Sequence, residues 1–155
     1  MPCPTPDTGP PAADATGAVV LCELRAEAVS VDEVLAAVAD PTCGAQVIFI
    51  GRVRDHDHAR QVARLGYSAH PEARERMAEV CAQVATEHDV RRVAALHRVG
   101  DLEIGDIAVV AAVASGHRQE AFAAGRDLID RIKAETPIWK HQRFADGADE
   151  WVGLP

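Results

Sequence analysis

Lysine is the residue whose use in this chain points most directly to chemistry. Of the 16 basic residues, only Lys133 and Lys140 are lysines, and all the others are arginines. An arginine guanidinium stays protonated, whereas a lysine amine loses its proton when it is desolvated or lies near another cation. The two lysines, which stand on either side of Thr136-Pro137, are therefore candidates for amine chemistry. The alternative is that both are ordinary solvated cations.

Two further segments have the residues to bind an anion. Residues 115–118 (Ser-Gly-His-Arg) join an apolar segment to a predicted helix, whose first backbone N–H groups and dipole favour a phosphate or carboxylate. Arg52 and Arg54 alternate at the end of a predicted strand, so they lie on one face and suit an oxyanion. The simpler interpretations are a capped helix with solvated side chains, and two surface arginines paired with acids.

Motifs that would define other kinds of site are missing or incomplete. The chain has no GxSxG, GxGxxG or GxxxxGK[ST] sequence, which disfavours a serine hydrolase elbow, dinucleotide binding and a phosphate-binding loop. Residues 55–58 (Asp-His-Asp-His) resemble a chelating string, but the sequence offers no convincing third ligand. We interpret them as a solvated loop and expect neither a bound metal nor a cofactor.

Composition limits the partners and the compartment. The 155 residues carry a net charge of −8 and only 4% aromatic side chains, which argues against binding to nucleic acid or to an anionic membrane. The N-terminal residues lack the basic and apolar regions of a secretory signal, and the cysteines have no CxxC spacing. We therefore expect reduced thiols and a cytoplasmic location. The cysteines are Cys3, Cys22, Cys43 and Cys81.

The pattern of apolar residues predicts one α+β domain. Residues 1–16, rich in Pro, Ala and Thr, are expected to form a flexible tail, and residues 17–155 the domain. We predict strands over 19–28, 45–53, 62–68, 91–99, 107–114 and 138–144, and helices over 31–39, 71–87 and 117–136. This order favours a mixed, mostly antiparallel sheet with hairpins, packed against two to three helices.

Two details of the sheet follow from the sequence. Residues 45–53 and 62–68 are separated by a charged loop, so they are predicted to pair as a hairpin. Residues 107–114 (IAVVAAVA) are apolar throughout, which is typical of a central strand that is buried on both faces.

The spacing along the last helix separates the candidate site residues. Arg118 and Lys133 are 15 positions apart, which is about 22 Å along a helix. One small-molecule pocket cannot easily take both from the same chain. We therefore expect a homodimer in which a second copy supplies one of them.

The motifs GAQVIFIGRVRDHD, LGYSAHPEA, ALHRVGDLEIGD, ASGHRQEAF and RIKAETPIWKHQ, followed by DEWVG, occur in this order between about residues 17 and 153. In this respect the chain resembles the large, catalytic subunits of molybdopterin synthase. The resemblance implies a sulfurtransferase that converts cyclic pyranopterin monophosphate into molybdopterin. The sulfur would arrive as a thiocarboxylate on the C-terminal Gly-Gly of a small ubiquitin-like subunit. Two small subunits would flank a central homodimer in a heterotetramer.

The resemblance also assigns roles to individual residues. Lys133 and Lys140 match the two active-site lysines of the family, and a neutral amine could move protons as sulfur is transferred. The residues implied in substrate binding are Arg52, Val53, Arg54, His117, Arg118, Lys133, Lys140, His141 and Gln142. Two other functions stay open on the residues alone: a non-catalytic module that binds a phosphorylated ligand, and a scaffold for the small partner.

Overall fold

The computed structural model describes residues 15–153, and most of the predicted tail, residues 1–14, lies outside them. The helices are α1 (Ala15–Ala18), α2 (Val31–Val38), α3 (Ala73–Glu87) and α4 (Arg118–Glu135). The strands are β1 (Val19–Arg25), β2 (Ala45–Arg52), β3 (His56–Asp57), β4 (Arg60–Ala69), β5 (Arg92–Arg98), β6 (Gly100–Leu102), β7 (Ile107–Ser115), β8 (Ile138–Phe144) and β9 (Asp149–Val152). None of the helices in this part of the chain has both the length and the apolar composition needed to cross a bilayer.

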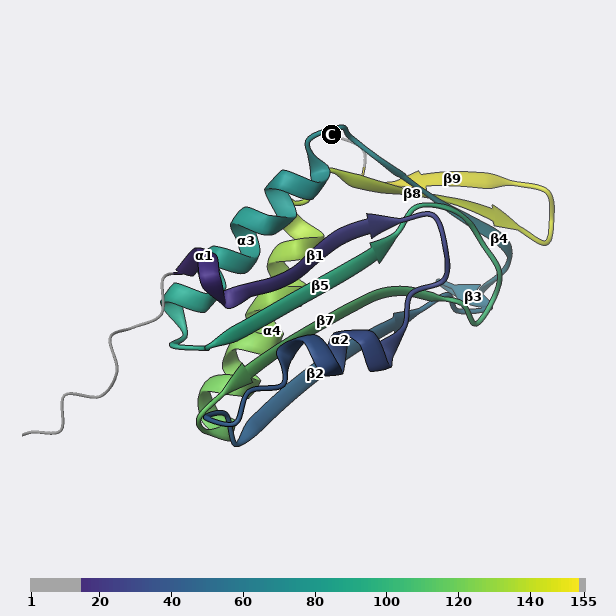
Figure 1. Cartoon of the computed structure of the whole chain (residues 1–155). Helices are drawn as coiled ribbons and strands as arrows, with labels where there is room; N and C mark the ends of the chain where they lie inside the picture. The colour runs from purple at the N-terminus through teal and green to yellow at the C-terminus, as the bar shows by residue number, and fades with distance from the viewer. Residues whose placement is uncertain (1–14, 154–155) are drawn as a thin grey trace, which may run out of the picture.

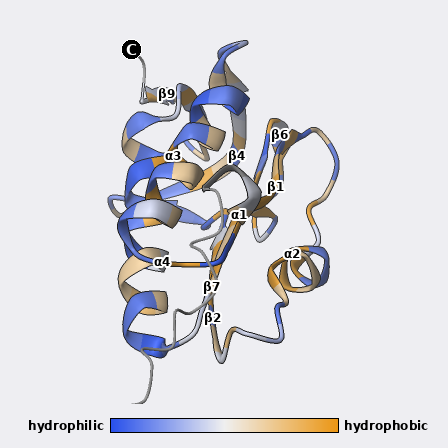
Figure 2. Cartoon of the chain, turned by 60° about the vertical axis from the view of Figure 1, so that its left-hand side comes forward, coloured by the Kyte–Doolittle hydropathy of each residue, from blue (hydrophilic) through white to orange (hydrophobic). Residues whose placement is uncertain are grey.

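A four-stranded sheet in the order β1-β5-β7-β2 forms the centre of the molecule (Figure 1). Helices α3 and α4 cover one face and α2 covers the other, as Figure 2 shows. The side chains of β5 alternate accordingly: Val93 and Ala95 pack toward α3 and α4, and Ala94 and Leu96 toward α2. This layered arrangement confirms the predicted α+β class, with one parallel pair, β1 and β5, among antiparallel neighbours.

Strand β7 has the central position expected from its apolar sequence. It pairs with β5 on one side and β2 on the other, and it is buried from Ala108 to Ser115. Because most of its side chains are Ala and Val, helices can approach closely on both faces. Helix α4 uses this space at Gly125, where an added Cβ would lie 2.7 Å from Cγ1 of Val47.

The helix ends follow local signals in the sequence. Ser30 caps α2 by accepting a hydrogen bond from the backbone N–H of Glu33, at 3.2 Å. Helix α4 begins after His117, whose backbone is extended, and it ends at Thr136, just before Pro137. The chain then enters β8 directly, so Lys133 and Lys140 are connected by a short, fixed path.

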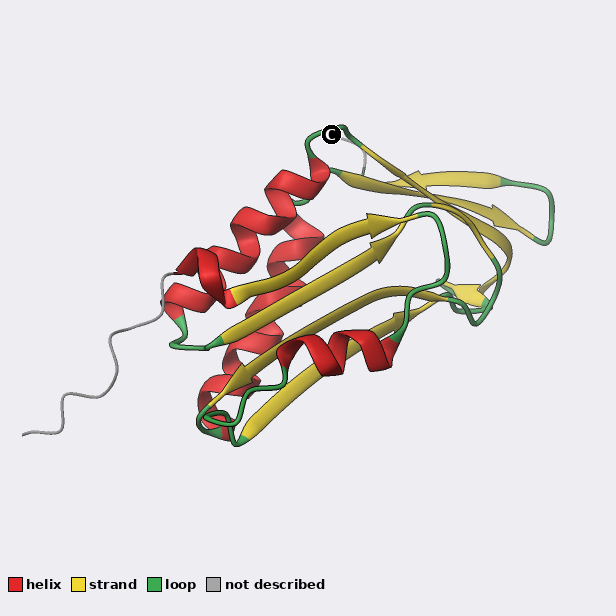
Figure 3. Cartoon of the chain, in the orientation of Figure 1, coloured by secondary structure: helices red, strands yellow, loops and turns green. Residues whose placement is uncertain are grey.

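A second, antiparallel sheet lies beyond one end of the first (Figure 3). Its strands run in the order β3-β4-β8-β9, and β6 also pairs with β4. A small apolar cluster of Val53, Leu65, Leu102 and Ala108 connects the two sheets. The strands that carry the candidate site residues therefore meet at this junction.

Three local expectations about this region were wrong. The predicted hairpin of residues 45–53 and 62–68 does not form, because β2 pairs with β7 in the first sheet while β4 pairs with β8 in the second. The loop between them instead contains β3, which forms a tight hairpin with β4 through residues of positive φ at His58 and Ala59. Residues 149–152, for which no strand was predicted, form the edge strand β9.

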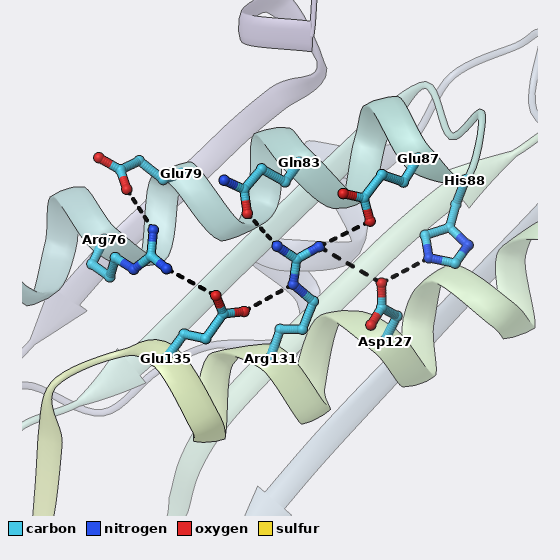
Figure 4. A network of polar contacts seen from close by, with 8 residues as sticks. All are labelled: Arg76, Glu79, Gln83, Glu87, His88, Asp127, Arg131 and Glu135. Carbon is cyan, nitrogen blue, oxygen red and sulfur yellow. Dashed lines mark hydrogen bonds and ion pairs between the residues drawn. The ribbon is translucent and has the colours of Figure 1, made fainter.

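The polar faces of α3 and α4 are joined by a network of charged side chains, which Figure 4 shows. Arg131 is its centre: its guanidinium lies 2.9 Å from the carboxylate of Glu135 and 3.1 Å from that of Glu87, and it also contacts Gln83. Arg76 bridges Glu135 to Glu79 at 2.8 and 2.7 Å. Nearly every charge in this network has a partner of opposite sign.

Candidate active site

Three of the predicted cations line one pocket at the junction of the two sheets. Arg52 comes from the end of β2, Lys133 from the last turn of α4 and Lys140 from β8. The pocket has a volume of about 230 Å³. Its other walls are Gly51, Tyr67, His97, Ala108, Val109, Ile129, Ile132, Thr136, Ile138, Val152 and Gly153. Positive charges over an apolar floor suit an anionic ligand with an organic ring.

Lys140 is held in the middle of the second sheet. It lies opposite Tyr67 on β4 and opposite Val152 on β9. Partial burial lowers the pKa of its amine, and the charges of Lys133 and Arg54 lower it further, while Asp57 and Glu150 act in the opposite direction. Lys140 therefore gives up its proton more readily than a solvated lysine.

Neither lysine has a carboxylate within ion-pairing distance among residues 15–153. Arg52 likewise has a neutral partner, because its Nη1 donates to the carbonyl of Gly105 at 2.9 Å. The cations of the pocket are thus fixed by backbone and strand geometry and remain free to bind an anion.

His97 and Tyr67 form the floor of the pocket, and neither was expected from the sequence. Their rings meet edge to face, with centroids 4.8 Å apart. Nδ1 of His97 lies 2.7 Å from the carbonyl of Arg98 and so carries the hydrogen, which leaves Nε2 as an acceptor. Burial lowers the pKa of His97, and the charge of Lys133 lowers it further, so the imidazole is neutral. The sequence placed both residues in predicted strands, but it gave no sign that they would line a pocket.

The other residues near Arg52 have different surroundings. Val53 is buried in the junction cluster, and its N–H and carbonyl bond to the backbone of Asp106 and Gly105 at 2.9 and 2.8 Å. Arg54 is exposed and lies 3.7 Å from the carboxylate of Asp57. Strand β2 ends at Arg52, after a bulge between Gly51 and Arg52, so Arg54 lies beyond the strand and the two arginines do not share one regular strand face.

Alternation along β8 separates the residues that follow Lys140. Gln142 lies on the same strand face as Lys140 and is almost fully buried, while His141 points to the opposite face. There His141 stacks on Trp151 with ring centroids 4.3 Å apart, and its Nε2 lies 2.9 Å from Asp149. The structure thus brings Gln142 close to the lysine pocket and places His141 outside it.

His117 and Arg118 lie at the opposite end of α4 from Lys133. Both are exposed, and His117 makes no side-chain bond to cap the helix. The length of α4, Arg118–Glu135, separates them from the pocket within one chain, as the spacing predicted.

One group of acids could in principle hold a metal ion. Glu87, His88 and Asp127 place their ligand atoms within 4.8 Å of one another. However, His88 already bonds to Asp127 at 2.8 Å, and the Arg131 guanidinium lies 3.1 Å from Glu87 and 3.9 Å from Asp127. The guanidinium of Arg131 thus already neutralises these two carboxylates, which disfavours a metal ion at this place. The chelating string at residues 55–58 makes local pairs, His56 with Asp55 and His58 with Asp57.

The fold and the pocket define a class: a small α+β protein with a pocket lined by two lysines and an arginine. Comparison with known proteins specifies that class. The family model described as "MoaE protein" matches residues 24–135. The molybdopterin synthase catalytic subunit 1 of Mycobacterium tuberculosis is 46% identical over 140 residues, covering 90% of this chain and 95% of the relative. That of Bos taurus is 33% identical and covers 84% of this chain and 70% of the relative.

Solved structures agree with this result. The crystal structure of molybdopterin synthase from Staphylococcus aureus has a TM-score of 0.80 at 32% identity and covers 85% of this chain and 96% of that one. A complex of subunits 1 and 2 of the molybdopterin-converting factor from Helicobacter pylori has a TM-score of 0.64 at 18% identity, which supports the fold alone; it covers 87% of this chain and 90% of that one. The chain belongs to the MoaE family, the catalytic subunits of molybdopterin synthase, which are sulfurtransferases of molybdenum cofactor biosynthesis.

Proposed function

We propose that the pocket of Arg52, Lys133 and Lys140 binds cyclic pyranopterin monophosphate and is where sulfur is transferred to it. The observation that carries this proposal is that the only two lysines of the chain line one pocket with a guanidinium, and that no acid of the described part of the chain, residues 15–153, lies within ion-pairing distance of either lysine. The phosphate is attracted by the fixed positive charges, and the pterin ring suits the floor formed by Tyr67 and His97.

The sulfur donor in this proposal is a small ubiquitin-like subunit with a C-terminal Gly-Gly thiocarboxylate. Its tail enters the pocket, and its sulfur forms a C–S bond at a substrate carbon as a carbon–oxygen bond of that carbon breaks and the oxygen leaves with a proton. Water then cleaves the bond between the sulfur and the acyl carbon of the tail, which releases the tail as a carboxylate and leaves the sulfur on the substrate. Lys133 and Lys140 hold and move the protons of these steps. The lowered pKa of Lys140 makes this amine the readier of the two to give up a proton. Cys22, Cys43 and Cys81 are free thiols, which fits the cytoplasmic location expected from the sequence.

The proposal includes a homodimer at the centre of a heterotetramer. His117 and Arg118 lie too far along α4 to reach the pocket of their own chain, and they would complete the pocket of a second copy. The pocket of one chain, at about 230 Å³, is smaller than the roughly 300–1,000 Å³ typical of ligand sites, which fits an incomplete site. Phe49 and Ile50 on the edge strand β2, with Phe122 on α4, are exposed apolar side chains available for such contact.

The substitution Lys133→Arg tests the catalytic role. It keeps the positive charge but removes the amine that can lose its proton. In a reaction with the thiocarboxylated small subunit and substrate, we expect product formation to fall by roughly 100-fold or more while substrate binding is largely kept. Turnover at the level of the unsubstituted protein would reject the role and favour the phosphate-binding module. If Lys133→Ala also leaves the function of the complex intact, the chain is a scaffold for the small partner.

Mixing two inactive variants tests the shared site. Arg118→Ala and Lys133→Arg each damage every pocket of their own homodimer. In a mixed dimer one pocket has both changes and the other has neither, so random exchange of subunits restores about a quarter of the full activity. A mixture as inactive as its two components would show that the pocket is complete within one chain.

A further inference from the structure

Asp57 is a mostly buried acid at the edge of the second sheet, outside the lining of the lysine pocket but close enough for its charge to act on Lys140. Asp57 ends the two-residue strand β3, and only 14% of its side chain is exposed although it lies in a charged loop. Its Oδ2 accepts a hydrogen bond of 2.7 Å from Nε2 of Gln142, which is almost fully buried. Its Oδ1 lies 3.7 Å from Arg54 and 3.6 Å from His58. The loop is thus tied to β8 through this one side chain.

Gln142 holds this carboxylate on the face of β8 that also carries Lys140. The two residues alternate along β8 and therefore lie on the same face of the strand. Among the charges around Lys140, Asp57 has the largest effect, ahead of Lys133, Arg54 and Glu150. Because Glu150 is exposed on the edge strand β9, Asp57 is the acid that is held in place near this amine.

We propose that Asp57 is a positioning residue that acts on Lys140 through its charge: its carboxylate, anchored by the buried amide of Gln142, balances the positive charge of the pocket without forming an ion pair with the amine. This inference rests on the proposed function only in that Lys140 takes part in catalysis. It also gives Gln142 a role that needs no contact with substrate, since its Nε2 hydrogen is directed to Asp57.

The sign of the effect follows from the charges. Burial lowers the pKa of Lys140, and the negative charge of Asp57 raises it toward the value of a free lysine. Asp57→Asn removes the charge but keeps an oxygen that can accept the Gln142 hydrogen bond, so the loop keeps its anchor. The pKa of Lys140 then falls further.

The chain offers a direct way to measure this shift. Because it has only two lysines, the full-length protein labelled with ¹³C at lysine Cε gives two resonances, and Lys133→Arg identifies which belongs to Lys140. We expect the titration midpoint of Lys140 to move to lower pH in Asp57→Asn and to stay in place in Asp57→Glu, which keeps the charge. Asp55→Asn is the matched control, since Asp55 bonds to His56 and is exposed.

Kinetics of the reconstituted complex provide the second measurement. The rate of the reaction changes with pH where Lys140 gains or loses its proton. In Asp57→Asn we expect this change to occur at lower pH, whether the reaction needs the protonated or the neutral amine. An unchanged Lys140 midpoint in the labelled Asp57→Asn protein overturns the inference, whatever the activity. A shifted midpoint with an unchanged rate profile supports the effect on Lys140 and instead contradicts the catalytic role of that lysine. If Asp57→Asn does not fold, Gln142→Ala tests the anchor: its Lys140 midpoint should also move, and no movement overturns the inference.

Discussion

Two groups of charged residues lie on or beside α4, and they differ in how their charges are balanced. In the network between α3 and α4, Arg131 contacts Glu135, Glu87 and Asp127 within 3.9 Å (Figure 4). Two residues further along the helix, Lys133 faces a pocket without a carboxylate in ion-pairing distance among the described residues. The arginine of the network is thus paired within the chain, whereas the lysine of the pocket remains available to a ligand.

The residue types match this difference. Arginine keeps its charge and forms several directed hydrogen bonds, which suits the network. Lysine can lose its proton, which suits the pocket, where partial burial and neighbouring cations already lower the pKa of Lys140. A single helix thus positions a permanent charge on one side and a titratable amine on another.

The largest expected effect comes from changing the pocket. In Lys140→Arg the charge stays but the titratable amine is lost, so we expect product formation to fall by roughly 100-fold. Thermal unfolding, followed by circular dichroism, should change little, since this lysine makes no ion pair among residues 15–153. A large loss of stability instead would mean that the pocket and the network do not differ as described.

The second effect comes from changing the network. Arg131→Ala leaves the acids of α3 and α4 facing one another without their shared cation, which should lower the free energy of unfolding by about 2 kcal/mol. Activity at a temperature well below the unfolding midpoint should be kept. Arg126→Ala is the control on the same helix, because its pair with Asp130 at 3.6 Å is exposed; it should be close to neutral in a denaturant titration.

The smallest effect concerns the pH dependence of stability. The pKa of His97 is lowered in the folded state by burial, so below the ordinary value of about 6.5 the unfolded chain binds a proton that the folded chain does not. The contribution of neutral His97 to the free energy of unfolding is therefore fully present above about pH 6.5 and is lost as the pH falls below this value. We expect the free energy of unfolding, measured by urea titration, to fall between pH 7 and pH 5 in both proteins. In His97→Asn the fall should be about 1 kcal/mol smaller than in the unsubstituted protein. An equal loss in both proteins would show that His97 is not the group responsible.

The sequence was sufficient where one type of local signal dominated. The apolar run of β7, the Ser30 cap and Pro137 each determine an element by themselves, and the structure confirms them. The rarity of lysine likewise identified two residues that share a pocket. These features depend on neighbouring residues or on composition, so no knowledge of the tertiary structure was needed.

The sequence was insufficient where pairing between distant segments decides the result. The segments β2 and β4 look like a hairpin, but each has a better partner far away in the chain, β7 and β8. The pocket floor is a similar case: His97 and Tyr67 become neighbours only when the second sheet folds over the end of the first. The predicted contact of His141 depended on strand register, which places it on the outer face.

The close approach of α4 to β2 at Gly125 has a consequence for both ends of that helix. Val47 lies so close that a side chain at this position would clash with it, so any larger residue would push the middle of α4 away from the sheet. His117 and Lys133 lie on opposite sides of this contact, toward the two ends of the helix, so pushing α4 away from β2 would displace both. A single methyl group at the centre of the helix would therefore disturb two distant groups at once, without touching either of them.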